Sequence, residues 1–350
     1  MVPNSSMLNR DHTIAIYMEG SLRSLHGKMG FGIMRYFPGQ IACIIDATFA
    51  GRRIDEVITS PCEAPIVATI EEACTLGAQV LVLGTAPSGG RIPPEWLGSL
   101  ETAINNGLSI VNGMHDRLKD RFGALESEDQ WIWDIRHPES FVPSIASGRA
   151  RTLTNKRVLL TGTDMAVGKM TTGLEIYHWL LAKEQSTVFL ATGQIGMAIT
   201  GNGIPLDAFK VDHACGAVEE MVVGAAGYGI VLIEGQGSLL HPASTATLPL
   251  MRGSCPTHLV LCHRAKATML DTCKGVRIPP LREVIALNES LAGAAGALTP
   301  ATTIGIALNT SRLEEHAAQK AIDELEDEAG LPVEDVVRFG AGKLASQLAN

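Results

Sequence analysis

The sequence predicts an α/β protein built from two doubly wound domains in tandem. Short runs of β-branched and other apolar residues alternate with helical stretches along the whole chain. This alternation gives parallel sheets that are covered by helices on both faces. A glycine-rich segment with a lysine, residues 162–171, directly follows one of these runs and opens a helical stretch. We therefore expect a ligand site at the carboxyl edge of the second sheet.

The elements of the first half follow from continuous apolar runs separated by helical patterns. Strands are expected at residues 13–18, 41–46, 79–84 and 108–112. Helices are expected at residues 28–36, 71–76 and 94–106.

The second half repeats this style without a sequence repeat. Strands are expected at residues 157–160, 187–191, 230–233, 258–262, 303–308 and 333–339, and helices at residues 169–182, 281–291 and 313–328. Residues 148–156 are polar and poor in large apolar side chains, which is typical of a linker. We therefore place the domains at residues 1–150 and 151–350.

Composition excludes several classes of protein. The chain has 350 residues, 46% of them hydrophobic and 19% charged, as expected for two well-buried globular domains. The net charge of -9 argues against a nucleic-acid partner. Seven scattered cysteines without a C-x-x-C pair fit reduced thiols. The sequence lacks a membrane-length apolar run and a signal-peptide core, so we expect a soluble, cytoplasmic protein with no membrane partner.

The segment GTDMAVGKMT has the layout of a phosphate-binding loop. Its glycines allow backbone N–H groups to point inward, the following helix contributes its dipole, and Lys169 adds a charge. Five residues separate the two glycines, where the usual pattern has four, and Met170 replaces the usual Ser or Thr. The residues predicted to bind the nucleotide are Gly162, Thr163, Asp164, Ala166, Val167, Gly168, Lys169, Met170, Thr171 and, after the next strand, Gln194.

A carboxylate ends the strand predicted at residues 230–233. Glu234 is followed by Gly235, Gln236 and Gly237, and His241 lies shortly downstream. An acid at the tip of a buried parallel strand, beside a phosphate loop, can organise magnesium or act as a base. We therefore predict Glu234, His241 and Lys169 as catalytic residues.

Strand ends in the first domain carry weaker signals. Asp46 resembles a ribose-hydroxyl acceptor, but the first turn lacks a tight GxGxxG, so dinucleotide binding is poorly supported. Residues 86–91 combine two glycines with Arg91, which suits either an anion site or a plain surface loop. The residues predicted to bind substrate are Arg91, His115, Arg136, Gly235 and Gln236.

Several of these motifs together resemble the DUF1611 family, whose named members are D-glutamate N-acetyltransferases. The motifs are GTDMAVGKMTT, ATGQIG, VEEMVVGAA, EGQGSLLHPA, LVLCH, IALNT and VRFGAG, with APSGGRIPPEW, NGMH and WDIRHP in the first half. The resemblance implies a Rossmann-like N-terminal domain and a P-loop NTPase-like C-terminal domain. The C-terminal half is also similar to dethiobiotin synthetase, which uses ATP to close amide bonds.

Two chemistries are therefore open, and both turn an amino group into an amide. The preferred hypothesis is an N-acyltransferase that takes an acetyl group from acetyl-CoA and acts on an acidic amino acid. The alternative is an ATP- and magnesium-dependent amide ligase, in which Thr171 and Glu234 would bind the metal. Met170 favours the transferase, because its thioether is a poor magnesium ligand.

A third hypothesis is a non-catalytic, nucleotide-sensing P-loop protein. In every case the expected partner is a small molecule, and we expect a homo-oligomer, since symmetric assemblies are common.

Overall fold

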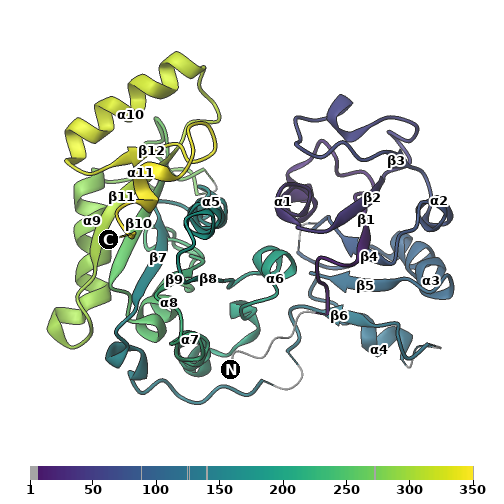
Figure 1. Cartoon of the computed structure of the whole chain (residues 1–350), viewed down its shortest axis with the longest axis horizontal. Helices are drawn as coiled ribbons and strands as arrows, with labels where there is room; N and C mark the ends of the chain where they lie inside the picture. The colour runs from purple at the N-terminus through teal and green to yellow at the C-terminus, as the bar shows by residue number, and fades with distance from the viewer. Residues whose placement is uncertain are drawn as a thin grey trace. The chain divides into compact units, whose positions relative to one another are not determined.

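The computed structural model describes residues 7–87, 89–123, 125, 127–138, 141–271 and 273–349, and they form two compact units (Figure 1). One unit holds the described residues up to 138 together with Gln194–Ala208. The other holds Phe141–Gly193 and the described residues from Phe209 onward. The chain therefore passes from one unit to the other near residue 140, at 193–194 and again at 208–209.

The N-terminal unit contains a parallel six-stranded sheet in the order β3-β2-β1-β4-β5-β6. This is the classical Rossmann order, which confirms the predicted fold of this half. The strands are β1 (Thr13–Tyr17), β2 (Gln40–Ile45), β3 (Ile66–Val67), β4 (Val80–Leu83), β5 (Ser109–Asn112) and β6 (Ile132–Asp134). The helices are α1 (Lys28–Tyr36), α2 (Ile70–Thr75), α3 (Leu97–Asn105), α4 (Leu118–Phe122) and α6 (Gln194–Thr200), with single turns η1 (Leu25–Gly27), η2 (Ile54–Glu56), η3 (Pro94–Trp96) and η5 (Leu206–Ala208).

The first strands are buried on both faces, as their continuous apolar sequences predict. Helix α1 approaches the sheet closely, since the amide of Gly30 donates to the carbonyl of Gly84 at 2.7 Å. A Cβ on Gly30 would lie 2.1 Å from the sulfur of Met18, so only glycine fits there. Strands β3 and β6 were not predicted, because runs of two and three residues are too short to show a period.

The C-terminal unit has a second parallel sheet in the order β12-β11-β10-β7-β9-β8, with α9 on one side and α5 on the other (Figure 1). The strands are β7 (Lys156–Gly162), β8 (Thr187–Leu190), β9 (Ile230–Ile233), β10 (His258–Arg264), β11 (Thr302–Asn309) and β12 (Val333–Glu334). The helices are α5 (Lys169–Ala182), α7 (Val211–Gly224), α8 (Thr247–Ser254), α9 (Leu281–Gly293), α10 (Glu315–Ala329) and α11 (Gly342–Ala345), with turns η4 (Arg149–Thr152) and η6 (Ala294–Gly296). None of the described helices combines the length and apolar composition that a membrane crossing requires.

The strand predicted at residues 333–339 is wrong beyond Glu334. The carboxylate of Asp335 accepts the amides of Thr310 at 2.9 Å, Val337 at 3.0 Å and Arg338 at 3.2 Å. A side chain that takes backbone N–H groups in this way forms a turn and ends the strand.

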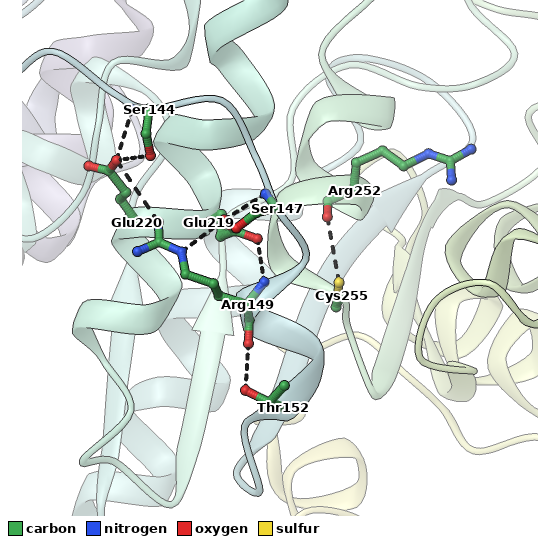
Figure 2. Close-up of polar contacts among 8 residues, drawn as sticks. All are labelled: Ser144, Ser147, Arg149, Thr152, Glu219, Glu220, Arg252 and Cys255. Atoms are coloured by element: carbon green, nitrogen blue, oxygen red, sulfur yellow. Dashed lines mark hydrogen bonds and ion pairs between the residues drawn. The ribbon is translucent and has the colours of Figure 1, made fainter.

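The linker predicted at residues 148–156 begins in a segment, residues 144–149, that two adjacent acids of α7 hold through hydrogen bonds (Figure 2). The buried carboxylate of Glu219 accepts the amides of Ser147 at 3.0 Å and Arg149 at 2.6 Å, and also the Arg149 Nε at 3.0 Å. Glu220 accepts the amide of Ser144 at 2.8 Å. A Cβ on Gly216 would lie 1.6 Å from the Ser144 carbonyl, so α7 and this segment are in backbone contact. The Glu-Glu pair of the VEEMVVGAA motif therefore fixes the entry to the C-terminal unit.

Replacing Glu219 by Ala should destabilise the protein by about 2–4 kcal/mol, because buried N–H donors lose their acceptor. Burial raises the pKa of Glu219, but the hydrogen bonds from Ser147 and Arg149 outweigh it and hold the pKa below its usual value. Its stabilisation is therefore complete above the pKa of an unfolded glutamate and disappears as pH falls through the lower folded pKa. Denaturant unfolding at several pH values should show that wild type has a larger free energy of unfolding than Glu219→Gln, and that this difference disappears as the pH falls. Glu220→Gln, at a half-buried neighbour, is the control and should cost less.

Candidate nucleotide site

The phosphate loop, residues 162–169, joins β7 to α5 as predicted. Gly168 caps α5 with a φ of +106°, which favours glycine. A Cβ on Gly162 would lie 2.8 Å from the Val167 side chain, so the loop curls back on itself at its start. The N-terminus of a fourteen-residue helix and a tight glycine-rich turn together form an anion-binding geometry.

Lys169 lies inside this loop and is only 5% exposed. Its Nζ donates to the carbonyls of Asp164 and Met165, both at 2.8 Å. Burial lowers its pKa to about 8, against the opposing charges of Cys262, Asp164 and Glu234. The direct hydrogen-bond partners of the ammonium are thus neutral carbonyl oxygens, and an incoming phosphate would add a negatively charged partner.

Glu234 follows β9 and is buried beside this lysine. Its Oε2 accepts the amides of Thr192 at 2.8 Å and Gly193 at 3.2 Å. Burial raises its pKa to about 7, although those two hydrogen bonds and the charge of Lys169 act in the opposite direction. A carboxyl group with this pKa can exchange a proton near neutral pH.

Gly235 allows the end of β7 and the turn after β9 to approach each other. A Cβ at this position would lie 1.6 Å from the Leu160 carbonyl and 2.9 Å from the Lys169 Cδ. Any side chain here would separate β7 from the turn after β9. The predicted proximity of Glu234 to the phosphate loop therefore depends on a glycine that sequence reasoning had assigned to substrate.

The segment after β10 is also bound to the loop. Asp164 accepts the Met165 amide at 2.7 Å and the Asp271 amide at 2.8 Å. Arg264 donates to the Ala166 carbonyl at 2.7 Å and forms an ion pair with Asp271. Sequence reasoning did not single out Asp271, because it lies beyond the strand end in an irregular stretch.

The residues after Lys169 do not form a ready magnesium site. Met170 offers a thioether, and Thr172 is buried with its hydroxyl 3.6 Å from the Cys262 sulfur. Asp164 and Glu234 already accept backbone amides, and among the described residues no group of three or more acidic, His or Cys side chains could hold a metal. The half-buried Thr171 would have to supply the hydroxyl ligand.

Two further predicted residues, Gln236 and His241, follow Glu234, and the structure shows their hydrogen bonds while their predicted roles stay predictions. The side-chain amide of Gln236 donates to the Thr192 carbonyl, and the backbone carbonyl of Gln236 accepts the Thr247 hydroxyl at 3.0 Å. His241 is buried, and its Nδ1 accepts the Ala243 amide at 3.1 Å. A histidine whose Nδ1 is engaged in this way carries its proton on Nε2, which suits a donor better than a base. Glu234 is therefore the stronger candidate for the base.

Arg91, His115 and Arg136 lie in the N-terminal unit at the carboxyl edge of its sheet. Arg91 pairs with Asp116 at 2.8 Å, and Arg136 donates to the Gly113 carbonyl at 2.7 Å. Burial and then the charges of Arg136 and Arg91 lower the pKa of His115. The three side chains are therefore neighbours, and their role in substrate binding stays a prediction. Ser88 of the predicted loop at residues 86–91 lies outside the described residues.

Gln194 begins α6 in the N-terminal unit, and its Cγ lies 3.1 Å from where a Cβ on Gly113 would be. Its predicted role in nucleotide binding stays a prediction.

The N-terminal sheet also has a cavity of about 770 Å³ at its carboxyl edge. Glu19, Glu71 and Glu95 line it, and none of the described residues around it is basic. Asp46 is fully buried, with its Oδ1 accepting the Thr48 amide at 2.9 Å. Such an acidic surface would repel a diphosphate, so the lining supports the sequence-based doubt about a dinucleotide here.

Lys169→Met should weaken nucleotide binding about 10- to 100-fold, the expected loss for a charge-assisted contact. It should leave the free protein at least as stable as wild type, because the folded state no longer buries an ammonium group with a lowered pKa. Calorimetric titration with nucleotides and thermal unfolding measure the two effects. An unchanged dissociation constant for every nucleotide would contradict the assignment of the loop.

Comparison with known proteins supplies independent findings. The model of the DUF1611 C-terminal P-loop domain matches residues 144–345, and that of the DUF1611 N-terminal Rossmann-like domain matches residues 47–138. A D-glutamate N-acetyltransferase of Tritonibacter scottomollicae is 37% identical over 285 residues, which cover 80% of this chain and 84% of the relative. Another of that name, from a Pseudoalteromonas species, is 35% identical with the same coverage.

A solved structure agrees with these sequence matches. A crystal structure of a DUF1611 family protein from Anabaena variabilis is 46% identical, with a TM-score of 0.92. The match covers 97% of this chain and 99% of that one. This chain therefore belongs to the DUF1611 family and carries its Rossmann-like N-terminal and P-loop C-terminal domains.

Proposed function

We propose that this protein is an N-acetyltransferase that moves the acetyl group of acetyl-CoA to the amino group of D-glutamate or a related acidic amino acid. The observation that carries the proposal is a phosphate loop whose lysine is followed by Met170 in place of a hydroxyl residue. Such a loop can anchor the diphosphate of coenzyme A without phosphoryl transfer. The name that two relatives bear supports the same reaction.

The proposed reaction uses Glu234 as the base. The buried carboxylate takes a proton from the substrate ammonium, and the free amine then attacks the thioester carbonyl. The carbon–sulfur bond breaks, the amide remains on the amino acid, and the thiolate takes up a proton to leave as coenzyme A. A carboxyl pKa of about 7 suits this role, because the group is partly deprotonated near neutral pH.

The substrate carboxylates require cations. Arg264 is one candidate, because its Nε is buried without a hydrogen-bond partner among the described residues and its Nη2 contacts the phosphate loop. Arg91 and Arg136 of the N-terminal unit remain the other predicted candidates.

An ATP-dependent amide ligase is the second candidate function. The observation that favours it is that the charges of Asp164 and Glu234 both act on Lys169, as in sites where acids organise magnesium around a transferred phosphate. Met170→Thr should raise ATP turnover by such a ligase and should have little effect on an acetyltransferase.

Purified protein with acetyl-CoA and D-glutamate should release coenzyme A and form N-acetylglutamate in the presence of a chelator and without ATP. Thiol release and mass spectrometry of the product measure this reaction, and L-glutamate and aspartate serve as comparisons. The ligase would gain support if ADP and phosphate accumulated with ATP and an amino acid while no thiol appeared. Nucleotide binding without turnover under both conditions would support a sensor.

Glu234→Gln should lower kcat about 100-fold or more, in line with general-base contributions. In wild type, kcat should rise with pH through about 7, because the base is active only when deprotonated, and then level off. This rise should disappear in Glu234→Gln. His241→Asn is the matched comparison, and a larger loss there would move the base to His241.

A further inference from the structure

The C-terminal unit has a cavity near the phosphate loop, in addition to the cavity of the N-terminal unit. It measures about 430 Å³ and lies between the end of β10, residues 265–268 and 277–281 of the segment that follows it, and α10. Its apolar lining includes Ile278, Leu281, Leu308 and Leu325, and its charged lining consists of Lys266, Arg277, Glu324 and Glu328, with His263 at the end of β10.

Three contacts connect this cavity and its segment to the phosphate loop. His263 lines the cavity, and its Nδ1 is 2.9 Å from the Thr163 hydroxyl of the loop. The Asp271 amide donates to Asp164 at 2.8 Å, and Arg264 donates to the Ala166 carbonyl at 2.7 Å. One residue, His263, therefore contacts the loop and also lines the cavity.

Lys266 and Arg277 are the cations of this cavity. Among the described residues, neither side chain has a recorded hydrogen bond or ion pair, whereas Glu324 on α10 pairs with Lys320 at 3.6 Å. Lys266 has a φ of +62°, an uncommon conformation for a residue with a side chain. Arg277 pairs with Met269 in an antiparallel β-bridge, which is flanked by backbone hydrogen bonds from Leu270 to Val276 at 3.0 Å and from Ile278 to Thr268 at 2.9 Å.

Coenzyme A carries one phosphate that ATP lacks, on the 3′-hydroxyl of its ribose. We propose that Lys266 and Arg277 bind this 3′-phosphate and that the apolar lining of the cavity receives the adenine. The inference rests on the proposed function, which it deepens by identifying what selects coenzyme A over ATP. Arg277 can bind a phosphate through two parallel N–H groups, and Lys266 adds a point charge. The loop and the cavity would then divide the three phosphates of one donor between them.

The test compares binding of coenzyme A with binding of 3′-dephospho-coenzyme A, by calorimetry on the full chain. Wild type should bind coenzyme A about 10-fold or more tightly, which corresponds to about 1.4 kcal/mol. In the double variant Lys266→Asn with Arg277→Gln, the ratio should fall to about 1, while the affinity for the dephospho form stays unchanged. Asn is used at position 266 because it tolerates a positive φ. The preference of wild type should also shrink with added salt.

Two variants act as controls. Lys274→Gln removes an exposed charge of the same segment that does not line the cavity, and it should keep the wild-type ratio. Lys169→Met should weaken both ligands equally. Thermal unfolding and the two single variants show whether a lost preference reflects misfolding.

The outcomes separate this inference from the proposed function. Equal binding of the two ligands by wild type, or an unchanged ratio in the folded double variant, would refute the 3′-phosphate site even if acetyl transfer occurs. A preserved preference without acetyl transfer to any amino acid would support the site and refute the transferase. Failure of both ligands to bind would refute both.

Discussion

Burying an ammonium group requires oxygen atoms that are already in place around it, and the phosphate loop supplies them to Lys169. The two carbonyls that accept its protons belong to the same loop, so the loop closes around its own lysine. The hydrophobic stem of this lysine packs against Gly235 of the turn after β9. Lys169 thus contacts both the phosphate loop and the turn that carries Glu234.

The carboxyl end of a third strand, β10, is connected to the phosphate loop in a different way. Residues after β10 reach the loop through Thr163, Asp164 and Ala166, so polar contacts rather than packing connect them. The site therefore has two parts. The part between β7 and β9 is closely packed because glycines allow backbone contact, and the part after β10 is held by polar side-chain contacts. Substitutions that change which donor binds are easier to accommodate in the part after β10, because its contacts do not hold the sheet together.

Local sequence was sufficient for the longer strands of both sheets and for the phosphate loop, because each of these strands is a continuous apolar run and the loop residues are adjacent in the chain. It was insufficient for α7, whose N-cap has no side-chain hydrogen bond and whose small residues Ala214, Gly216 and Ala217 pack closely instead of forming an apolar stripe. Residues 333–339 look like a strand, yet the carboxylate of Asp335 turns the chain. The hydrogen bonds of Glu219 to Ser147 and Arg149 join residues about seventy positions apart, and no sequence pattern extends over that distance.

The same limit applies to the site residues. Glu234 was predicted because it follows a strand and precedes a glycine-rich turn, whereas Asp271 and the residues of the proposed 3′-phosphate site, Lys266 and Arg277, lie in an irregular stretch without a periodic signal. His241 was chosen for its position near the strand end, but its ring orientation depends on the Ala243 amide. The orientation of the His241 ring therefore cannot be predicted from the sequence, because it is set only when the turn has folded.

The return of residues 194–208 to the N-terminal unit has a consequence for synthesis of the chain. Helix α6 packs with α1, and Asp207 forms an ion pair with Arg136. A ribosome must therefore translate β7, α5 and β8 of the other unit before the first unit can be completed. The usual order, in which an N-terminal domain finishes folding while the next is still being made, does not apply here. Nascent chains would therefore expose the surface of α1 that α6 covers until residues 194–208 have been made.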